Sequence, residues 1–209
     1  PNTNTIPPTT TFSIAPGANV TPRWIGLVGG PVQVRSTNGV NIFASERVFT
    51  YPYNSFNEVM GYPANQFTTE YWFPWYDTVY MNTYLLVGNT SASESAEVDI
   101  FIGTSKMGSY TIAPNATVKQ RYASKVDGPV RVVSTNAGNI VASEFTLSGS
   151  ENSFNEVMGY PFDQFDSEYW FPYYDHGYPN VSGNKMRTWI LVGNPSSTLT
   201  ANVQIYIDG

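Results

Sequence analysis

The chain has 209 residues, room for one large or two ordinary domains, and 41% of them are hydrophobic, which excludes a disordered polymer. Only 12% are charged and the net charge is −6, so the basic surface that nucleic acid binding needs is missing. There are no cysteines, which excludes disulfides and thiolate chemistry, and no apolar run is long enough to span a bilayer.

Six short runs of β-branched and aromatic residues, separated by turn signals, predict six strands in the middle of the chain. The alternation is clearest where Val98, Ile100 and Ile102 share one face of a strand. No window shows a sustained helical period. Strands at this spacing predict an all-β fold of Ig-like antiparallel β-sandwich type. The predicted strands are 84–88, 96–102, 108–112, 118–122, 130–133 and 140–145.

Part of the sequence is repeated at a constant spacing. Ser55–Pro63 recurs letter for letter as Ser153–Pro161, and Glu70–Asp77 recurs as Glu168–Asp175 with one substitution. The offset is 98 residues in both cases. Repetition over this much chain predicts two copies of one folding unit. All these repeated segments contain prolines, so we predict that they form long, aromatic-rich connections between the units and stay out of central strands. We call Glu70–Asp77 the first aromatic segment and Glu168–Asp175 the second.

The spacing grows after the second aromatic segment. Leu86–Asn89 matches Leu191–Asn194 at an offset of 105, so seven additional residues lie within 176–187, where glycine and proline predict a surface loop. The repeat therefore places one whole unit, with its aromatic connection, at 83–175. The second unit is predicted to assemble from both ends of the chain, 1–82 plus 176–209.

The division of the second unit separates the two strands of a hairpin. The strands equivalent to the hairpin at 96–112 are Ala201–Ile207 and Thr11–Ile14. Each alone would be an unpaired edge, which proteins avoid, so we predict that the two pair. Pairing within one chain would close the molecule as a clasp, and this is our main prediction. Pairing between chains would build a head-to-tail polymer by strand addition.

Three segments resemble repeats in large extracellular β proteins of bacteria, of the kind found on the surface of Chloroflexota. The segments are Asn155–Pro161, Trp189–Pro195 and Gly128–Ser134. The resemblance would extend over nearly the whole chain. It implies a surface location and tandem Ig-like sandwiches, and it implies no catalytic residue.

Three pairs of acidic residues recur in both copies. Two carboxylates beside a cleft could serve a glycosidase, but a catalytic pair rarely occurs identically in both halves of a duplicated chain. We therefore predict no enzyme and no cofactor, with the carboxylates accepting backbone N–H bonds. Calcium is the alternative, since it binds clustered carboxylate and carbonyl oxygens. The pairs are Glu58 and Glu156, Glu70 and Glu168, and Asp77 and Asp175; the candidate calcium ligands are Glu58, Asp77, Glu156 and Asp175.

Aromatic side chains are dense in the two aromatic segments. Exposed rings can stack on sugars, which makes a carbohydrate-binding module an alternative function. Our main interpretation is that the rings fill the end of a sandwich or an interface between units. The solvent exposure of Trp72 and Trp170 distinguishes the two. The candidate ligand-binding residues are Trp72, Trp75, Tyr76, Trp170, Tyr173 and Tyr174.

A surface poor in charge and rich in Asn, Ser, Thr and Tyr is typical of β proteins outside cells. We predict an extracellular or cell-surface structural protein that acts in assembly or adhesion, as a filament if head-to-tail strand pairing occurs. Its predicted partners are copies of itself or neighbouring repeats, with glycan as the alternative. We predict no nucleic acid partner and no membrane insertion.

Overall fold

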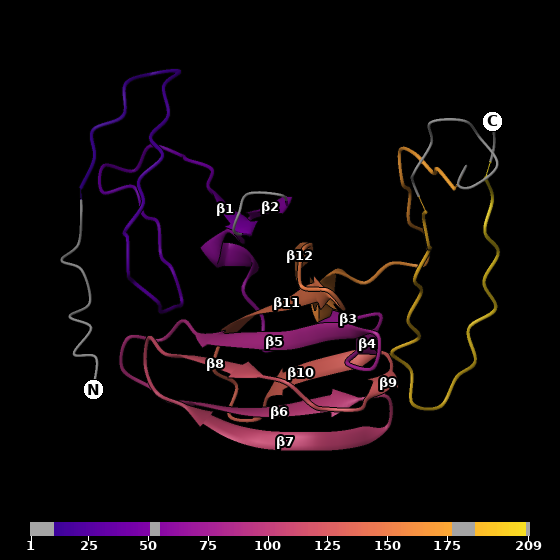
Figure 1. Ribbon diagram of the computed structural model, residues 1–209. Coiled ribbons are helices and arrows are strands. Elements are labelled where there is room, and N and C mark those ends of the chain that lie inside the picture. The colour runs from indigo at the N-terminus through magenta and orange to yellow at the C-terminus, as the bar shows by residue number, and fades with distance from the viewer. Residues whose placement is uncertain (1–10, 51–54, 177–186, 208–209) are drawn as a thin grey trace.

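The computed structural model describes residues 11–50, 55–176 and 187–207. A central sandwich, residues 64–165, carries two extended arms that lie on opposite sides of it (Figure 1). We call the described residues between 11 and 63 the N-terminal arm. Those between 166 and 207 are the C-terminal arm. The all-β, sandwich-like fold predicted from the sequence is confirmed.

One layer of the sandwich is a five-stranded antiparallel sheet in the order β13-β3-β10-β6-β7. Its middle strand, β10, pairs with β3 on one side and β6 on the other. Burial alternates strictly along β6, because successive side chains of a strand point to opposite faces. The strands are β3 (Glu70–Phe73), β6 (Ala96–Ile102), β7 (Ser105–Ile112), β10 (Val130–Ser134) and β13 (Tyr160–Pro161).

The second layer is a four-stranded antiparallel sheet in the order β12-β11-β5-β8. A two-stranded ladder, β4 with β9, and two single-turn 3-10 helices complete the central sandwich. The strands of the sheet are β5 (Met81–Asn89), β8 (Thr117–Gln120), β11 (Ile140–Ser148) and β12 (Phe154–Met158). The remaining elements are β4 (Tyr76–Asp77), β9 (Val126–Asp127), η1 (Ala64–Gln66) and η2 (Phe162–Gln164).

The two sheets enclose one hydrophobic core of fourteen buried residues. Eleven are aliphatic and three are aromatic, and most lie on alternate positions of their strands, as the period of two predicts. The core residues are Tyr71, Phe73, Tyr76, Leu85, Val87, Ala96, Val98, Ile100, Ile102, Ile112, Val130, Val132, Ile140 and Ala142.

The first aromatic segment is a strand and not a connection, which corrects our prediction. Its residues form β3, between β13 and β10, and they bury Tyr71 and Phe73 in the core. Pro74 follows directly and lies outside the strand, since proline cannot donate to the ladder. The strands of the sandwich therefore begin at Glu70 and not at residue 83. The second aromatic segment, 168–175, lies in the C-terminal arm and not in the central unit.

The second unit, predicted from 1–82 plus 176–209, is not assembled among the residues that the structure describes. The N-terminal arm forms a single hairpin of β1 (Ser45–Thr50) and β2 (Ser55–Met60), and the described part of the C-terminal arm contains no strand. Thr11–Ile14 and Ala201–Ile207 do not pair, and they lie on opposite sides of the sandwich (Figure 1). The clasp is therefore wrong for the single chain. Much of the predicted loop at 176–187 lies outside the described residues.

Candidate assembly surfaces

The recurring acidic residues do not come together. Among the described residues, no group of three or more His, Asp or Glu side chains is placed to hold a metal ion. Asp77 Oδ1 accepts the backbone N–H groups of Val79 and Tyr80, at 2.8 and 2.9 Å. This is the structural role that the sequence also allowed. It closes the turn between β4 and β5.

Glu58 and Glu156 make the same bond in two places. Ser45 Oγ donates to Glu58 Oε1 at 2.7 Å, and Ser143 Oγ donates to Glu156 Oε1 at 2.7 Å. Hydrogen bonds from Ser45 and from the Arg47 guanidinium lower the pKa of Glu58. Each carboxylate joins the two strands of its own hairpin. The fourth candidate ligand, Asp175, accepts a long bond from the Tyr173 hydroxyl at 3.5 Å in the C-terminal arm.

Of the candidate sugar-binding rings in the first aromatic segment, Tyr76 is excluded by burial. Its side chain is fully buried, its hydroxyl donates to the Thr83 carbonyl at 3.1 Å, and the same oxygen accepts the Tyr122 N–H at 2.7 Å. Trp72 is half-buried, and its indole N–H donates to Glu70 Oε1 at 2.6 Å. Trp75 remains exposed at 43%. The three rings therefore do not form one sugar-binding platform.

In the second aromatic segment the equivalent rings are exposed. Trp170 is 86% exposed, although its indole N–H makes the same bond to Glu168 Oε1, also 2.6 Å. Tyr173 and Tyr174 are exposed as well. The two segments thus share a local conformation and differ in what covers them.

The arms keep the local geometry of the central sandwich elsewhere too. Asn89 Nδ2 donates to the Glu94 carbonyl at 2.7 Å, and Asn194 Nδ2 donates to the Leu199 carbonyl at 2.8 Å. The hairpin β1–β2 has the register of β11–β12, with Ser45 opposite Met60 as Ser143 is opposite Met158. Each arm therefore has the turn and hairpin geometry of the corresponding part of a sandwich.

What the arms lack is the opposite layer of a sandwich. Thirteen of the fourteen core residues have an identical residue at the equivalent arm position, and the fourteenth, Leu85, is matched by Ile190. Twelve of these arm residues are exposed, and Ala44 and Ile190 are half-buried. Val130, for example, is fully buried, whereas Val32 is 73% exposed. The exposed residues are Ile14, Val32, Val34, Ile42, Tyr169, Phe171, Tyr174, Val192, Ala201, Val203, Ile205 and Ile207.

The strand order explains why neither arm folds alone. Residues equivalent to β7 to β13 lie in the N-terminal arm and those equivalent to β3 to β6 in the C-terminal arm. In the order β13-β3-β10-β6-β7, every neighbouring pair would therefore join one arm to the other. In the four-stranded sheet, only β11 and β12 come from the same arm. Their equivalents are β1 and β2, and this hairpin is the one that forms.

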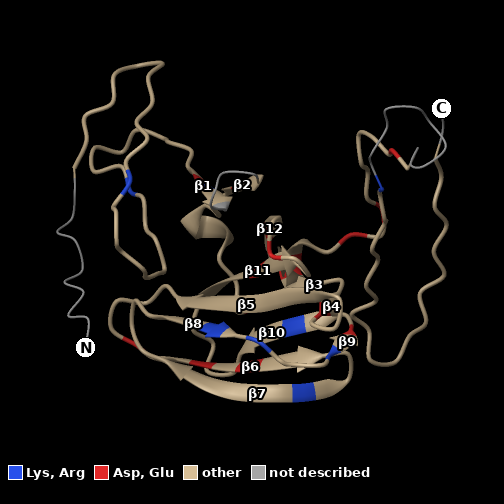
Figure 2. Ribbon diagram, in the orientation of Figure 1, with Lys and Arg blue, Asp and Glu red and all other residues tan. Residues whose placement is uncertain are grey.

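Charge does not oppose a contact between the arms. Residues 188–207 carry no charged side chain, and residues 11–45 carry only Arg23 and Arg35. Figure 2 shows both arms largely free of coloured segments. The outward-facing Glu97 and Asp99 of β6 are matched by the neutral Asn202 and Gln204. These two segments thus carry little charge, and the positions equivalent to the central core are apolar.

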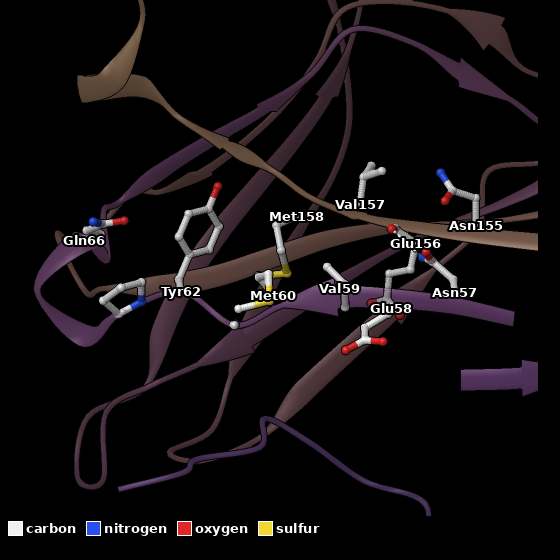
Figure 3. A pocket seen from close by; sticks show the side chains of 12 residues that line it. Asn57, Glu58, Val59, Met60, Tyr62, Gln66, Asn155, Glu156, Val157 and Met158 are labelled. Atoms are coloured by element: carbon white, nitrogen blue, oxygen red, sulfur yellow. Dashed lines mark hydrogen bonds between the residues drawn. The ribbon is translucent and has the colours of Figure 1, made fainter. Parts of the chain in front are cut away.

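The repeated hairpins also touch each other. Asn57 Nδ2, on β2, donates to the backbone carbonyl of Glu156, on β12, at 2.7 Å. Tyr62 donates through its hydroxyl to the Gly159 carbonyl at 2.8 Å. A groove lies between the two segments, with Asn57 to Met60 on one side and Asn155 to Met158 on the other (Figure 3). The sequence analysis did not predict this contact, although the unbroken identity of the two segments pointed to a shared constraint.

Glu144 is a second feature that the sequence analysis missed. It follows Ile140 and Ala142 on the buried face of β11, so the alternation of the strand places it inward. Burial raises the pKa of Glu144 to about 8. Its Oε2 is the one buried side-chain oxygen or nitrogen in the described part of the chain without a hydrogen bond.

No family model, no curated protein and no solved structure matches this chain. Within the described ranges, the helical elements are single 3-10 turns, and no helix could cross a membrane.

Proposed function

We propose that this chain is an extracellular structural protein that assembles head to tail, by strand pairing between copies. The C-terminal arm of one copy and the N-terminal arm of the next together form a sandwich like the central one. The observation that supports this most directly is the exposure, in the arms, of the same apolar residues that fill the central core. Burying apolar surface of this kind is the main favourable term in association.

The register of the new sheet follows from the central one. Val132 of β10 faces Tyr71 of β3 and Ile100 of β6. By the same spacing, Val34 of one copy faces Tyr169 and Ile205 of the other. The segment around Val34 of one copy then lies between two strands of the neighbouring copy. The backbone groups that each arm leaves unpaired in the single chain become paired.

A structural role also accounts for the exposed aromatic rings. In the complete sandwich Tyr71, Phe73 and Tyr76 belong to the core, so their exposed equivalents Tyr169 and Phe171 become core residues on assembly. A glycan would have to compete with that burial. The carbohydrate-binding alternative is therefore weaker than assembly, and it predicts sugar binding by the separated chain.

Cysteine cross-linking tests the assembly, and the chain has no cysteine of its own to interfere. Val133 faces Asp99 in the central sheet, so Arg35 is expected to face Gln204 of the neighbouring copy. The double variant Arg35→Cys, Gln204→Cys should give a ladder of disulfide-linked oligomers. Co-expressed single variants should give dimers only. The matched control, Arg35→Cys with Ser197→Cys, places the second thiol in the turn before the strand and should not cross-link.

Two results would overturn the proposal. The first is a double variant that forms its disulfide within one chain and remains monomeric, because that is the clasp. The second is a wild-type chain that stays monomeric by light scattering at all concentrations, together with a double variant that forms no disulfide between copies. Labelling of intact cells with antibodies against the chain tests the extracellular location separately.

A further inference from the structure

The contact between β2 and β12 joins two identical sequences that lie 98 residues apart in the chain. We call this contact between repeated hairpins the stack. Ser55 and Ser153 approach through their Oγ atoms at 3.5 Å, and the Phe154 N–H points to Ser55 Oγ at 3.4 Å. Asn57 makes the bond to Glu156 already described. Ser55 and Asn57 thus meet their own copies, or the residues next to them, in the second hairpin.

The two strands use opposite faces in this contact. On β2 the half-buried residues are Ser55, Asn57 and Val59, and the residues between them are exposed. On β12 the alternation is the reverse, because Phe154, Glu156 and Met158 are buried or half-buried. The face of β2 that carries Asn57 therefore meets β12 at its open edge, through the Phe154 N–H and the Glu156 carbonyl, which belong to the buried or half-buried positions of β12.

Because the two segments are identical, each strand also carries the face that the other one uses. β12 has a second face like that of Asn57, made by Ser153, Asn155 and Val157, and these residues are exposed. β2 has a second face like that of Glu156, made by Phe56, Glu58 and Met60, and they are exposed too. The two exposed faces are complementary by the same rule that joins the hairpins within the chain.

We infer that β12 of one copy stacks on β2 of the next, with the Asn155 amide donating to the Glu58 carbonyl. This rests on the proposed function, since pairing of the arms brings the neighbouring hairpin to the edge of the central sandwich. The occupant of the exposed β12 face is a second copy of this chain. No hydrogen bond of the Asn155 side chain occurs among the described residues, so the amide is available for this contact.

The stack determines the symmetry of the assembly. The contact is heterologous, because the donor and acceptor faces differ, and it repeats with the 98-residue unit both within and between chains. A contact of this kind does not close on itself unless the rotation per unit happens to complete a ring. Asparagine amides repeated at each step, donating to the backbone of the next hairpin, would form a ladder along the assembly.

A second cysteine pair tests the stack independently of the arms. Asn155→Cys and Glu58→Cys, on separate co-expressed copies, should cross-link as dimers. Asn57→Cys with Glu156→Cys, the equivalent pair within one chain, should form a disulfide in the monomer and shows that the geometry permits one. Asn155→Cys with Asn65→Cys, on separate copies, is the out-of-register control.

The outcomes separate the two proposals. If the Arg35–Gln204 pair cross-links copies and the Asn155–Glu58 pair does not, while the pair within the chain does, the stack is wrong and the arm pairing stands. If neither pair joins two copies, the proposed function fails.

Val157→Arg gives an independent measurement: it should shorten filaments seen by electron microscopy and leave the Arg35–Gln204 cross-link intact. Filaments of unchanged length would contradict the stack.

Discussion

Ile100 and Ile205 occupy the same position of the repeat, yet Ile100 is fully buried and Ile205 is 58% exposed. Their neighbours are alike, since Val98 and Ile102 are matched by Val203 and Ile207. The difference lies in the partner strands, because β10 and β7 flank Ile100, whereas no described residue of the chain forms a strand beside Ile205. An identical apolar face is thus covered in one half of the molecule and uncovered in the other.

Alanine substitution at these two positions should therefore affect two different properties, the stability of the central sandwich and the assembly of copies. Ile100→Ala should lower the free energy of unfolding of the central sandwich by about 2–5 kcal/mol, because a cavity replaces a fully buried side chain. Ile205→Ala should change it by less than about 0.5 kcal/mol, as for an exposed residue, and should instead weaken assembly. Urea unfolding of the dissociated chain and light scattering measure the two effects. Equal destabilisation of the central sandwich by both variants would contradict this assignment.

A polar pair offers a second matched comparison. Asn89 is buried, and besides its bond to Glu94 its amide donates to the Ile112 carbonyl at 2.9 Å. Asn89→Ala leaves these carbonyls without a donor, so it should cost at least about 2 kcal/mol in thermal or urea unfolding. Asn194→Ala is the control. Asn194 is exposed, and its substitution should leave unfolding of the central sandwich unchanged.

The strands β5, β6, β7, β8, β10 and β11 were predictable because each of them carries its own local signal. Residues 96–102 alternate without a break, and the predicted strand coincides with β6. The aromatic segment at 70–73 was misassigned, since Pro74 suggested a connection while the burial of Tyr71 and Phe73 depends on distant strands. The place of Glu144 could have been read from the alternation of β11, but its burial depends on the opposite sheet.

The strand pairing of the two arms was not predictable in the same way. The alternation in Ala201–Ile207 indicates a strand, yet the segment forms none within this chain. A strand needs a neighbour to satisfy its backbone, and local sequence does not determine which molecule supplies it. The repeat shows which segments match, and only the three-dimensional arrangement shows that the two arms lie apart (Figure 1).

The buried carboxyl group of Glu144 predicts that the central sandwich becomes less stable as the pH rises. The pKa of Glu144 is about 8 in the folded chain and near 4.5 in the unfolded one. The contribution of the protonated Glu144 side chain to the free energy of unfolding is therefore fully present below pH 4.5. It is lost as the pH rises toward 8, by up to about 1.4 kcal/mol per pH unit. Glu144→Gln should remove this dependence and raise the melting temperature at pH 8. Calorimetry at pH 5, 6.5 and 8 measures it, and an equal slope in both proteins would exclude Glu144 as the cause.

Glu46 is the equivalent of Glu144 in the N-terminal arm, and it connects pH to assembly. Burial, and then the charge of Glu156, already raise the pKa of Glu46 in the single chain. Closing a second sandwich over it should raise that pKa further, toward the value of Glu144, so that assembly takes up a proton. Head-to-tail assembly should therefore strengthen as the pH falls from 8 toward 5. Glu46→Gln should assemble equally well across this range, while Glu94→Gln, whose side chain is exposed in a turn of the central sandwich, should keep the dependence. Sedimentation at several pH values distinguishes them, and wild-type assembly that strengthens with rising pH would contradict the burial of Glu46.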